Sequence, residues 1–181
     1  LCAAPGGKTL QLAAQGWQIT ALDISKRRLD LLKANLKRTG LKANTVRADA
    51  LKWEPKHQYD AILLDAPCTA TGTARRHPDV LHRIGARQIE EMAELHTALL
   101  QQAQGWLKPG GTLVYATCSL EREEGEDQTG AVTMPTLAVS PDELPAGLAA
   151  TAEGWIRTDP GMLVDAGGLD GFFIARWRRG A

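Results

Sequence analysis

Residues 19–47 read ITALDISKRRLDLLKANLKRTGLKANTVR, and this stretch decides the fold. Ile19 to Asp23 and Thr45 to Arg47 are short, apolar or β-branched runs of strand length. Between them Ser25 is a favourable helix N-cap, leucines recur at helical spacing, and Gly40 is a typical helix stop. The stretch therefore predicts a strand, a helix and a second strand, which together form a βαβ unit.

The same alternation continues along the chain. Tyr59 to Leu64 and Thr112 to Thr117 are further strand-like runs, and a helical pattern covers Ala86 to Leu107, before a turn at Pro109-Gly110-Gly111. Gly171 to Trp177 returns to strand character and could pair antiparallel. We predict an α/β fold with a Rossmann-like, doubly wound and mostly parallel sheet, whose ligands bind beyond the carboxyl ends of the strands.

Composition predicts one globular domain over residues 1–181, with 44% apolar and 23% charged residues. Residues 121–162, rich in Pro, Gly, Ala and Thr after an acidic start, are expected to form a variable surface excursion. The 21 basic residues balance the 21 acidic ones, so no global positive field attracts nucleic acid, although a local basic strip could. No apolar run suits a membrane span or signal peptide, and a cytoplasmic protein is expected.

The three cysteines are too few and too widely spaced for a disulfide framework or a zinc site, so we expect free thiols and no metal. The chain also starts at Leu1 without an initiator Met, as a piece of a longer protein would.

A glycine-rich loop, Ala4-Pro5-Gly6-Gly7-Lys8-Thr9, precedes a helical stretch from Leu10 to Gln15. Backbone N–H groups at such a helix N-terminus favour a polar or anionic ligand. A nucleotide triphosphate loop would need a glycine where Cys2 stands, and the dinucleotide pattern of three glycines is absent. A turn with a purely geometric role stays open as the alternative.

Two acidic residues follow the first strands. Asp23 ends one strand, where doubly wound proteins place the acidic residue that binds ribose hydroxyls, and Asp49 lies just past the next. Either could instead cap a helix. Together with the glycine-rich loop, they predict an adenosine pocket.

Two cysteines also follow strands. Asp65-Ala66-Pro67-Cys68 comes after one apolar run and Thr117-Cys118-Ser119 after another. Because parallel strands share one carboxyl edge, these thiols can meet there beside a carboxylate. A single buried cysteine is usually inert, but two at strand ends near a nucleoside pocket favour a chemical role.

Arg75-Arg76-His77, with Arg83 and Arg87 beyond, forms a locally basic stretch. It could follow an RNA backbone. A solvated loop and helix face is the alternative reading.

In combination, these motifs resemble the RNA cytosine-5 methyltransferases that use S-adenosylmethionine, most closely the bacterial type that modifies 16S ribosomal RNA. The residues that carry the resemblance are Cys2 to Thr9, Asp23-Ile24-Ser25 with Arg28-Leu29, Asp65 to Gly72, Arg75 to Asp79, Tyr115 to Ser119 and Asp170 to Phe173. Where the family often shows Glu-Asn-Glu, this chain has Glu124-Gly125-Glu126.

The resemblance implies a role for each matching residue. Cys118 would be the nucleophile that attacks carbon 6 of cytosine, Cys68 would assist product release, and Asp65 would steady the ring. The implied cofactor contacts are Cys2, Ala3, Ala4, Pro5, Gly6, Gly7, Lys8, Asp23, Arg28, Asp49 and Asp65. From the basic stretch we expect RNA contacts at Arg75, Arg76 and His77.

The resemblance also implies a monomer with a helical RNA-binding domain and a central first strand located upstream of Leu1. A tRNA or another rRNA cytosine stays open as the substrate. A non-catalytic RNA-binding module and a nucleotide triphosphatase are the alternatives from other functional classes, the second disfavoured by Cys2 in place of glycine.

Overall fold

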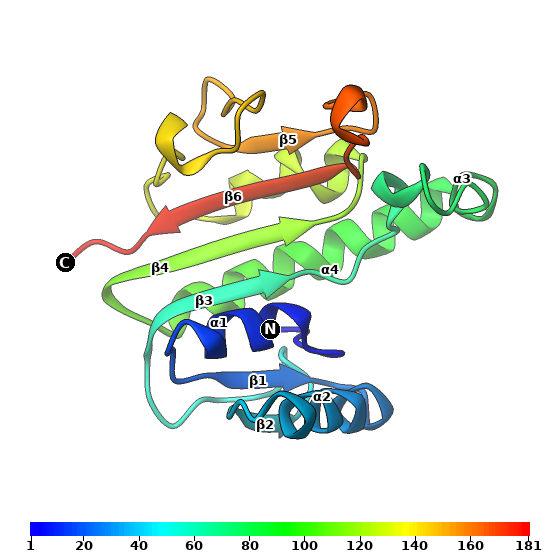
Figure 1. Ribbon diagram of the computed structural model, residues 1–181. Coiled ribbons are helices and arrows are strands. Elements are labelled where there is room, and N and C mark those ends of the chain that lie inside the picture. Colours follow the sequence, from blue (N-terminus) through cyan, green and yellow to red (C-terminus); the bar gives the residue numbers. More distant parts are fainter. The chain divides into compact units, whose positions relative to one another are not determined.

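The computed structural model describes residues 1–181, which divide into two compact units, residues 1–56 and residues 57–181. The first unit contains α1 (Gly7–Ala14), β1 (Thr20–Asp23), α2 (Lys26–Thr39) and β2 (Asn44–Arg47) (Figure 1). The strands β1 and β2 pair in parallel, with Ala21 opposite Thr45. The predicted βαβ unit is therefore confirmed.

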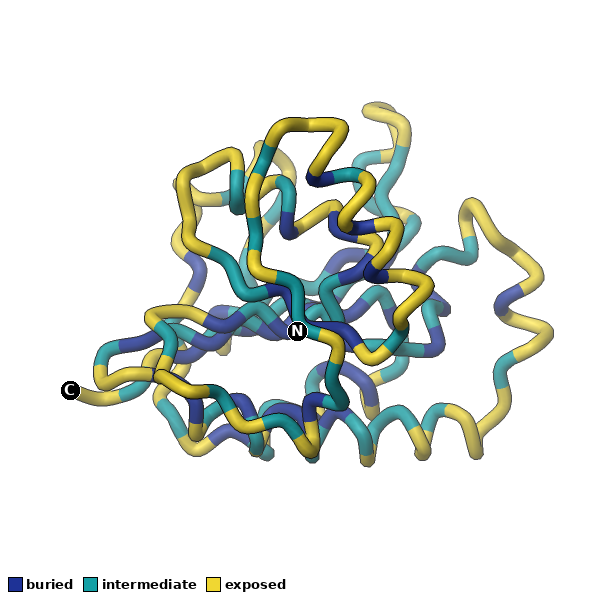
Figure 2. The backbone as a smooth tube through the Cα atoms, turned by 90° about the horizontal axis from the view of Figure 1, so that it is seen from below, coloured by how far each residue is buried: buried dark blue, intermediate teal, exposed yellow.

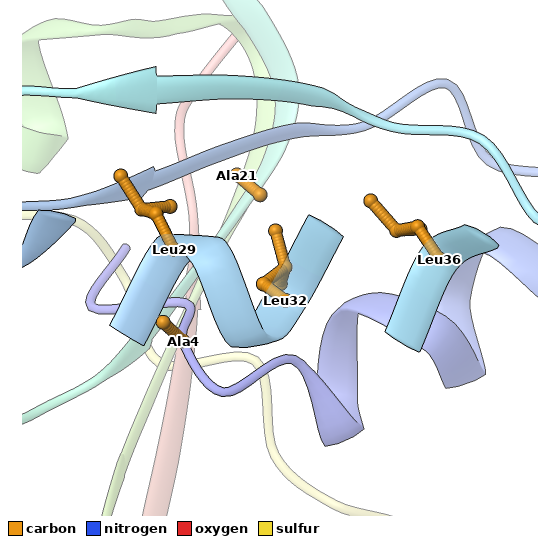
Figure 3. Packing of buried hydrophobic residues seen from close by; sticks show 5 residues of the cluster. All are labelled: Ala4, Ala21, Leu29, Leu32 and Leu36. Atoms are coloured by element: carbon orange, nitrogen blue, oxygen red, sulfur yellow. The ribbon is translucent and has the colours of Figure 1, made fainter. Parts of the chain in front are cut away.

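The ends of α2 form as the sequence predicts. Ser25 is the N-cap, and its hydroxyl accepts a hydrogen bond from the Arg28 amide. Gly40 closes the helix in the left-handed conformation, with φ of 70°. Leucines on the face of α2 that turns towards β1 form the core of this unit (Figure 3); the buried cluster is Ala4, Ala21, Leu29, Leu32 and Leu36.

The second unit is a four-stranded sheet with the order β3-β4-β6-β5. Its strands are β3 (Tyr59–Asp65), β4 (Leu107–Thr117), β5 (Ile156–Thr158) and β6 (Phe172–Arg178). The strands β3 and β4 are parallel, whereas β6 runs antiparallel to both β4 and β5. Parallel pairing places the ends of β3 and β4, at Asp65 and Ala116, side by side.

Helices complete the second unit. The short α3 (Val80–Arg83) precedes the long α4 (Ala86–Gly105), which runs along one face of β3 and β4 (Figure 1). The buried side of α4 carries His96, Leu99, Leu100 and Ala103. Along much of the whole chain, buried and exposed residues alternate (Figure 2). No helix is long and apolar enough to cross a membrane.

Two sequence predictions are corrected by the structure. Pro109-Gly110-Gly111 is not a turn before the strand: it lies inside β4, where the register with β3 shifts between Tyr59 and Ala61. Glycine at 110 makes this irregularity possible, since its φ is 74°. The helix that precedes it ends at Gly105 rather than Leu107.

Residues 121–162 are also more structured than a surface excursion. They include three short 3-10 helices, namely η2 (Arg122–Glu124), η3 (Glu126–Ala131) and η4 (Pro141–Glu143), and the edge strand β5. Glu124, Gln128, Val132 and Val139 are buried there. The helices and the strand in this segment have at most six residues each, so their sequence pattern is too short to predict this packing.

Gly6 gives a direct test of the packing in the first unit. It has φ of 111°, and an added Cβ would lie 2.5 Å from Cδ1 of the buried Leu32. We expect Gly6→Ala to lower the free energy of unfolding by about 1–3 kcal/mol, because both the backbone conformation and the packing are lost. The measurement is equilibrium unfolding in urea.

Gly7 is the matched control. An added Cβ there meets no atom within 4 Å, and the residue begins α1. Gly7→Ala should leave stability unchanged or raise it slightly. Equal destabilisation by both substitutions would contradict the packing argument.

Candidate active site

In the first unit, the segment from Leu1 to Gly6 leads into α1 and is held by backbone contacts. The Ala3 amide donates to the Leu22 carbonyl at 3.0 Å, and the Ala4 amide donates to Asp23 Oδ2 at 3.1 Å. Gly6 is the N-cap of α1, and no side chain caps this helix. The N-terminus of α1 is therefore suited to receive a polar or anionic group from a ligand.

Asp23 lies at the end of β1, as predicted, but its carboxylate is only 2% exposed. It accepts hydrogen bonds from the amides of Ala4 and Ser25, and Arg28 lies 3.7 Å from it. Arg28 also donates to the Ala4 carbonyl. In this structure Asp23 and Arg28 thus clamp the glycine-rich loop, and their contacts with a cofactor stay a prediction.

Asp49 and Lys8 are more accessible. Asp49 is about one third exposed and accepts a hydrogen bond from the Leu51 amide at 3.0 Å, which shapes the turn after β2. Lys8 is exposed on the first turn of α1. Both remain candidates for ligand contact.

In the second unit, the two predicted catalytic cysteines meet. The Sγ atoms of Cys68 and Cys118 lie 3.3 Å apart, and both residues are free thiols. Cys68 follows β3 and Cys118 follows β4, so the parallel pairing of these strands brings them together. The prediction that the two thiols share one edge of the sheet is confirmed.

Backbone contacts at Gly72 hold the two thiol-bearing loops together. The Gly72 amide donates to the Cys118 carbonyl at 2.9 Å, and the Gly171 amide donates to the Gly72 carbonyl at 2.7 Å. A Cβ at position 72 would lie 2.2 Å from the Gly171 oxygen and 2.7 Å from the Cys118 oxygen. Only glycine therefore fits here.

The contact between the thiols changes how they ionise. The hydrogen bond from Cys118 lowers the pKa of Cys68 to about 7, and burial opposes this shift. The same contact raises the pKa of Cys118, as do burial and the nearby charges of Cys68 and Asp65. The pair thus loses one proton near neutral pH and keeps the second, so that one thiolate and one thiol coexist.

A buried histidine supports the Cys68 loop from beneath. His96 is fully buried on α4, and burial lowers its pKa, so the ring is neutral near pH 7. Its Nε2 lies 2.5 Å from the Pro67 carbonyl. Nδ1 lies 2.7 Å from the Tyr115 hydroxyl, which also contacts the Glu124 carbonyl.

An open cavity of about 620 Å³ lies beside Cys68. Val80, Ile84 and Met92 give it an apolar wall, and His77, Arg83 and Gln88 add polar groups. Its size and mixed lining suit part of a nucleotide.

The predicted RNA-binding arginines are engaged within the chain. Arg76 binds Asp170 with its Nε atom 2.8 Å from Oδ2, and Arg75 Nη2 lies 3.6 Å from Oδ1 of the same residue. The Arg76 guanidinium lowers the pKa of Asp170. Arg83 and Arg87 pair with Asp79 and Glu91, so the basic strip is partly neutralised, while His77 is exposed.

Sequence reasoning missed the contacts of His96 and Glu124 beside the thiols, and the pairing of Asp170 with Arg76. A histidine on an apolar helix face, and acidic residues in irregular segments, give no pattern that assigns them to a site. For Glu124 and Asp170 the only signal was their place in segments that correspond to family motifs.

A family model described as "16S rRNA methyltransferase RsmB/F" matches residues 1–178. The chain belongs to the RsmB/F family. The small subunit methyltransferases B of Shewanella oneidensis and Klebsiella pneumoniae are 42% and 45% identical to it, in each case over 97% of the chain. The chain spans about 40% of the length of these relatives. The family predicted from the sequence is confirmed.

Solved structures agree with this assignment. NSun6 from Pyrococcus horikoshii, determined with SFG, has a TM-score of 0.84 and 34% identity, over 98% of this chain and 46% of its own. The N-methyltransferase NodS from Bradyrhizobium japonicum, determined with S-adenosyl-L-homocysteine, shares the fold at a TM-score of 0.57 and 16% identity, over 96% of this chain and 72% of its own. The Rossmann-like α/β fold class is confirmed, and the predicted cofactor, S-adenosylmethionine, is consistent with the SFG complex of NSun6.

The thiol contact predicts a distinct alkylation profile. The rate at which iodoacetamide labels Cys68 is measured by peptide mass spectrometry over a range of pH. This rate should reach half of its maximum near pH 7. Cys118→Ala removes the hydrogen bond, so the Cys68 half-point should rise by about one unit or more. Cys2 in the same samples reports the behaviour of the reagent, and its profile should be the same in both proteins.

His96 predicts an acid-dependent loss of stability. Burial lowers its pKa in the folded state below the unfolded value of about 6.5, so the unfolded state binds the proton first as pH falls. The stability contributed by neutral His96 is therefore present above about pH 6.5 and is lost below it. Urea unfolding between pH 7 and pH 5 should show a steeper decline for the native protein than for His96→Gln. Parallel declines would show that His96 is not the group responsible.

Proposed function

We propose that this chain carries the catalytic site of an S-adenosylmethionine-dependent methyltransferase that acts on carbon 5 of a cytosine in RNA, with 16S ribosomal RNA as the substrate. The observation that carries the proposal is the pair of thiols, 3.3 Å apart, at the joined ends of β3 and β4. Membership of the RsmB/F family supports the class of reaction and the RNA.

The first unit supplies residues that fit the cofactor. An uncapped helix N-terminus at α1 offers amide donors for a carboxylate, and the partly exposed Asp49 can accept from hydroxyls. We assign cofactor binding to the loop from Cys2 to Lys8, with Asp23 and Arg28 holding that loop in place. When bound, S-adenosylmethionine supplies an electrophilic methyl group on sulfonium.

The second unit supplies the nucleophile. Carbon 5 of cytosine reacts only once the ring has been activated, and addition of a thiolate to carbon 6 achieves this. The sulfur of Cys118 forms a bond to carbon 6, and the electron pair of the carbon 5–carbon 6 double bond becomes available at carbon 5. Cys118 reacts as the thiolate, so its thiol proton must first leave. Asp65 is assigned to hold the N3 and amino edge of the ring.

Product release needs the reverse electron flow. After carbon 5 has been methylated, a base must remove its proton. The electrons of that carbon–hydrogen bond then restore the double bond as the bond from carbon 6 to Cys118 breaks. Cys68 is the group assigned to this step, because its sulfur lies 3.3 Å from the sulfur of Cys118.

The substrate base must be accessible on both ring faces, so an unstacked cytosine is expected. The cavity beside Cys68 offers space for a neighbouring part of the RNA, and His77 and Arg83 on its wall can approach phosphate. Retention of both thiols in contact argues against a non-catalytic module. Cys2 in place of the first glycine of a phosphate loop argues against a triphosphatase.

A trapped adduct tests this assignment. The full-length protein with Cys68→Ala is incubated with unmodified small-subunit rRNA and S-adenosylmethionine and then run on a denaturing gel. Without Cys68 the carbon 5 proton stays in place and the sulfur–carbon bond persists. We therefore expect a retained protein–RNA band.

The control is the double variant Cys68→Ala, Cys118→Ala, which should give no band. A band that survives removal of Cys118 would contradict its role as nucleophile. Absence of any band, with RNA and cofactor binding demonstrated, would contradict the proposed cytosine chemistry or the roles of the two thiols.

A further inference from the structure

Glu124 is a buried carboxyl group that the proposed reaction does not use. It lies in η2, which follows β4, and its exposed fraction is 0%. Its Oε2 accepts a hydrogen bond from the Thr69 amide at 2.9 Å, and its Oε1 accepts from the Ser119 hydroxyl at 2.9 Å. The Thr69 hydroxyl also donates to Oε1.

The partners of Glu124 have one property in common. Thr69 directly follows Cys68, and Ser119 directly follows Cys118. A single carboxyl group therefore binds the residue next to each thiol, although the two residues lie 50 positions apart in the sequence. Any change in its position would move the backbone after both sulfurs.

Hydroxyl groups extend this contact into a network. The Ser119 hydroxyl lies 3.2 Å from the hydroxyls of both Thr69 and Thr71, and the Thr71 hydroxyl accepts from the Leu120 amide at 2.9 Å. Buried polar networks in which the members are hydrogen-bonded fix geometry more tightly than apolar contacts, because hydrogen bonds are directional. The network thus defines the separation of the two loops.

The backbone of Glu124 is itself anchored. Its carbonyl accepts a hydrogen bond from the hydroxyl of Tyr115, which is fully buried in β4. His96 lies 2.7 Å from that hydroxyl and also contacts the Pro67 carbonyl, one residue before Cys68. The Cys68 loop is therefore held on both sides of the sulfur, by His96 at Pro67 and by Glu124 at Thr69.

We propose that Glu124 is a positioning residue for the thiol pair: by binding Thr69 and Ser119 at once, it sets the separation across which Cys68 and Cys118 share a proton. The inference rests on the proposed function of the two cysteines.

The test measures the thiols directly, in the full-length protein without RNA or cofactor. Alkylation of Cys68 by iodoacetamide is followed across pH in the native protein, Glu124→Ala and Glu124→Gln. In Glu124→Ala the loops lose their shared acceptor and the sulfurs separate. The half-point of Cys68 should then rise from near pH 7 by about one unit, and its rate at pH 7 should fall about fivefold.

Glu124→Gln keeps one acceptor oxygen for the Thr69 amide and should show a smaller shift. Glu123→Ala is the matched control, because Glu123 is the exposed neighbour in the same short helix, and its profile should not change. Leu99→Ala, a buried substitution on α4, controls for loss of stability alone and should also leave the profile in place.

An unchanged profile in a folded Glu124→Ala protein would overturn the proposal, as would an equal shift in Leu99→Ala. If Glu124→Ala does not fold, Glu124→Gln decides, since a profile identical to the native one would then overturn it. Methyl transfer plays no part in this readout. A failed adduct experiment would therefore leave the positioning result intact, and a failed positioning result would leave the adduct experiment intact.

Discussion

The parallel pairing of β3 with β4 is the constraint on which the thiol site depends. Parallel neighbours end at the same edge, so the chains that leave Asp65 and Thr117 start side by side. The intervening helix α4 makes the return possible, because a parallel crossover needs a long connection. The loops that follow β3 and β4 then bring the two sulfur atoms into contact.

Those loops are held chiefly by polar contacts. Backbone hydrogen bonds at Gly72 join the segment after β3 to the segment after β4, and buried carboxyl and hydroxyl groups fix their separation. A neutral histidine beneath them completes the support. Polar contacts therefore hold the thiol pair in a fixed arrangement, which is consistent with chemistry that depends on a short sulfur–sulfur distance.

Much of this could be predicted from local patterns. Ser25 and Gly40 mark the ends of a helix because capping is decided by single residues, and the strand ends beside Asp65 and Cys118 follow from apolar runs. The site residues that could not be predicted make contacts across long separations. Glu124 reaches Thr69 and Asp170 reaches Arg76, and neither lies in a periodic segment. The strand irregularity at Gly110 was missed because a glycine next to a proline occurs in turns and in strand bulges alike.

The close approach at Gly72 has a consequence for sequence variation. The backbones of three segments meet there, and a methyl group in place of hydrogen would collide with two carbonyl oxygens. Such a contact cannot be adjusted in small steps, because every substitution adds at least one carbon atom. Substitutions that are tolerated in this region must therefore fall on the surrounding side chains. The spacing between the backbones that carry Cys68 and Cys118 stays the same while those side chains vary.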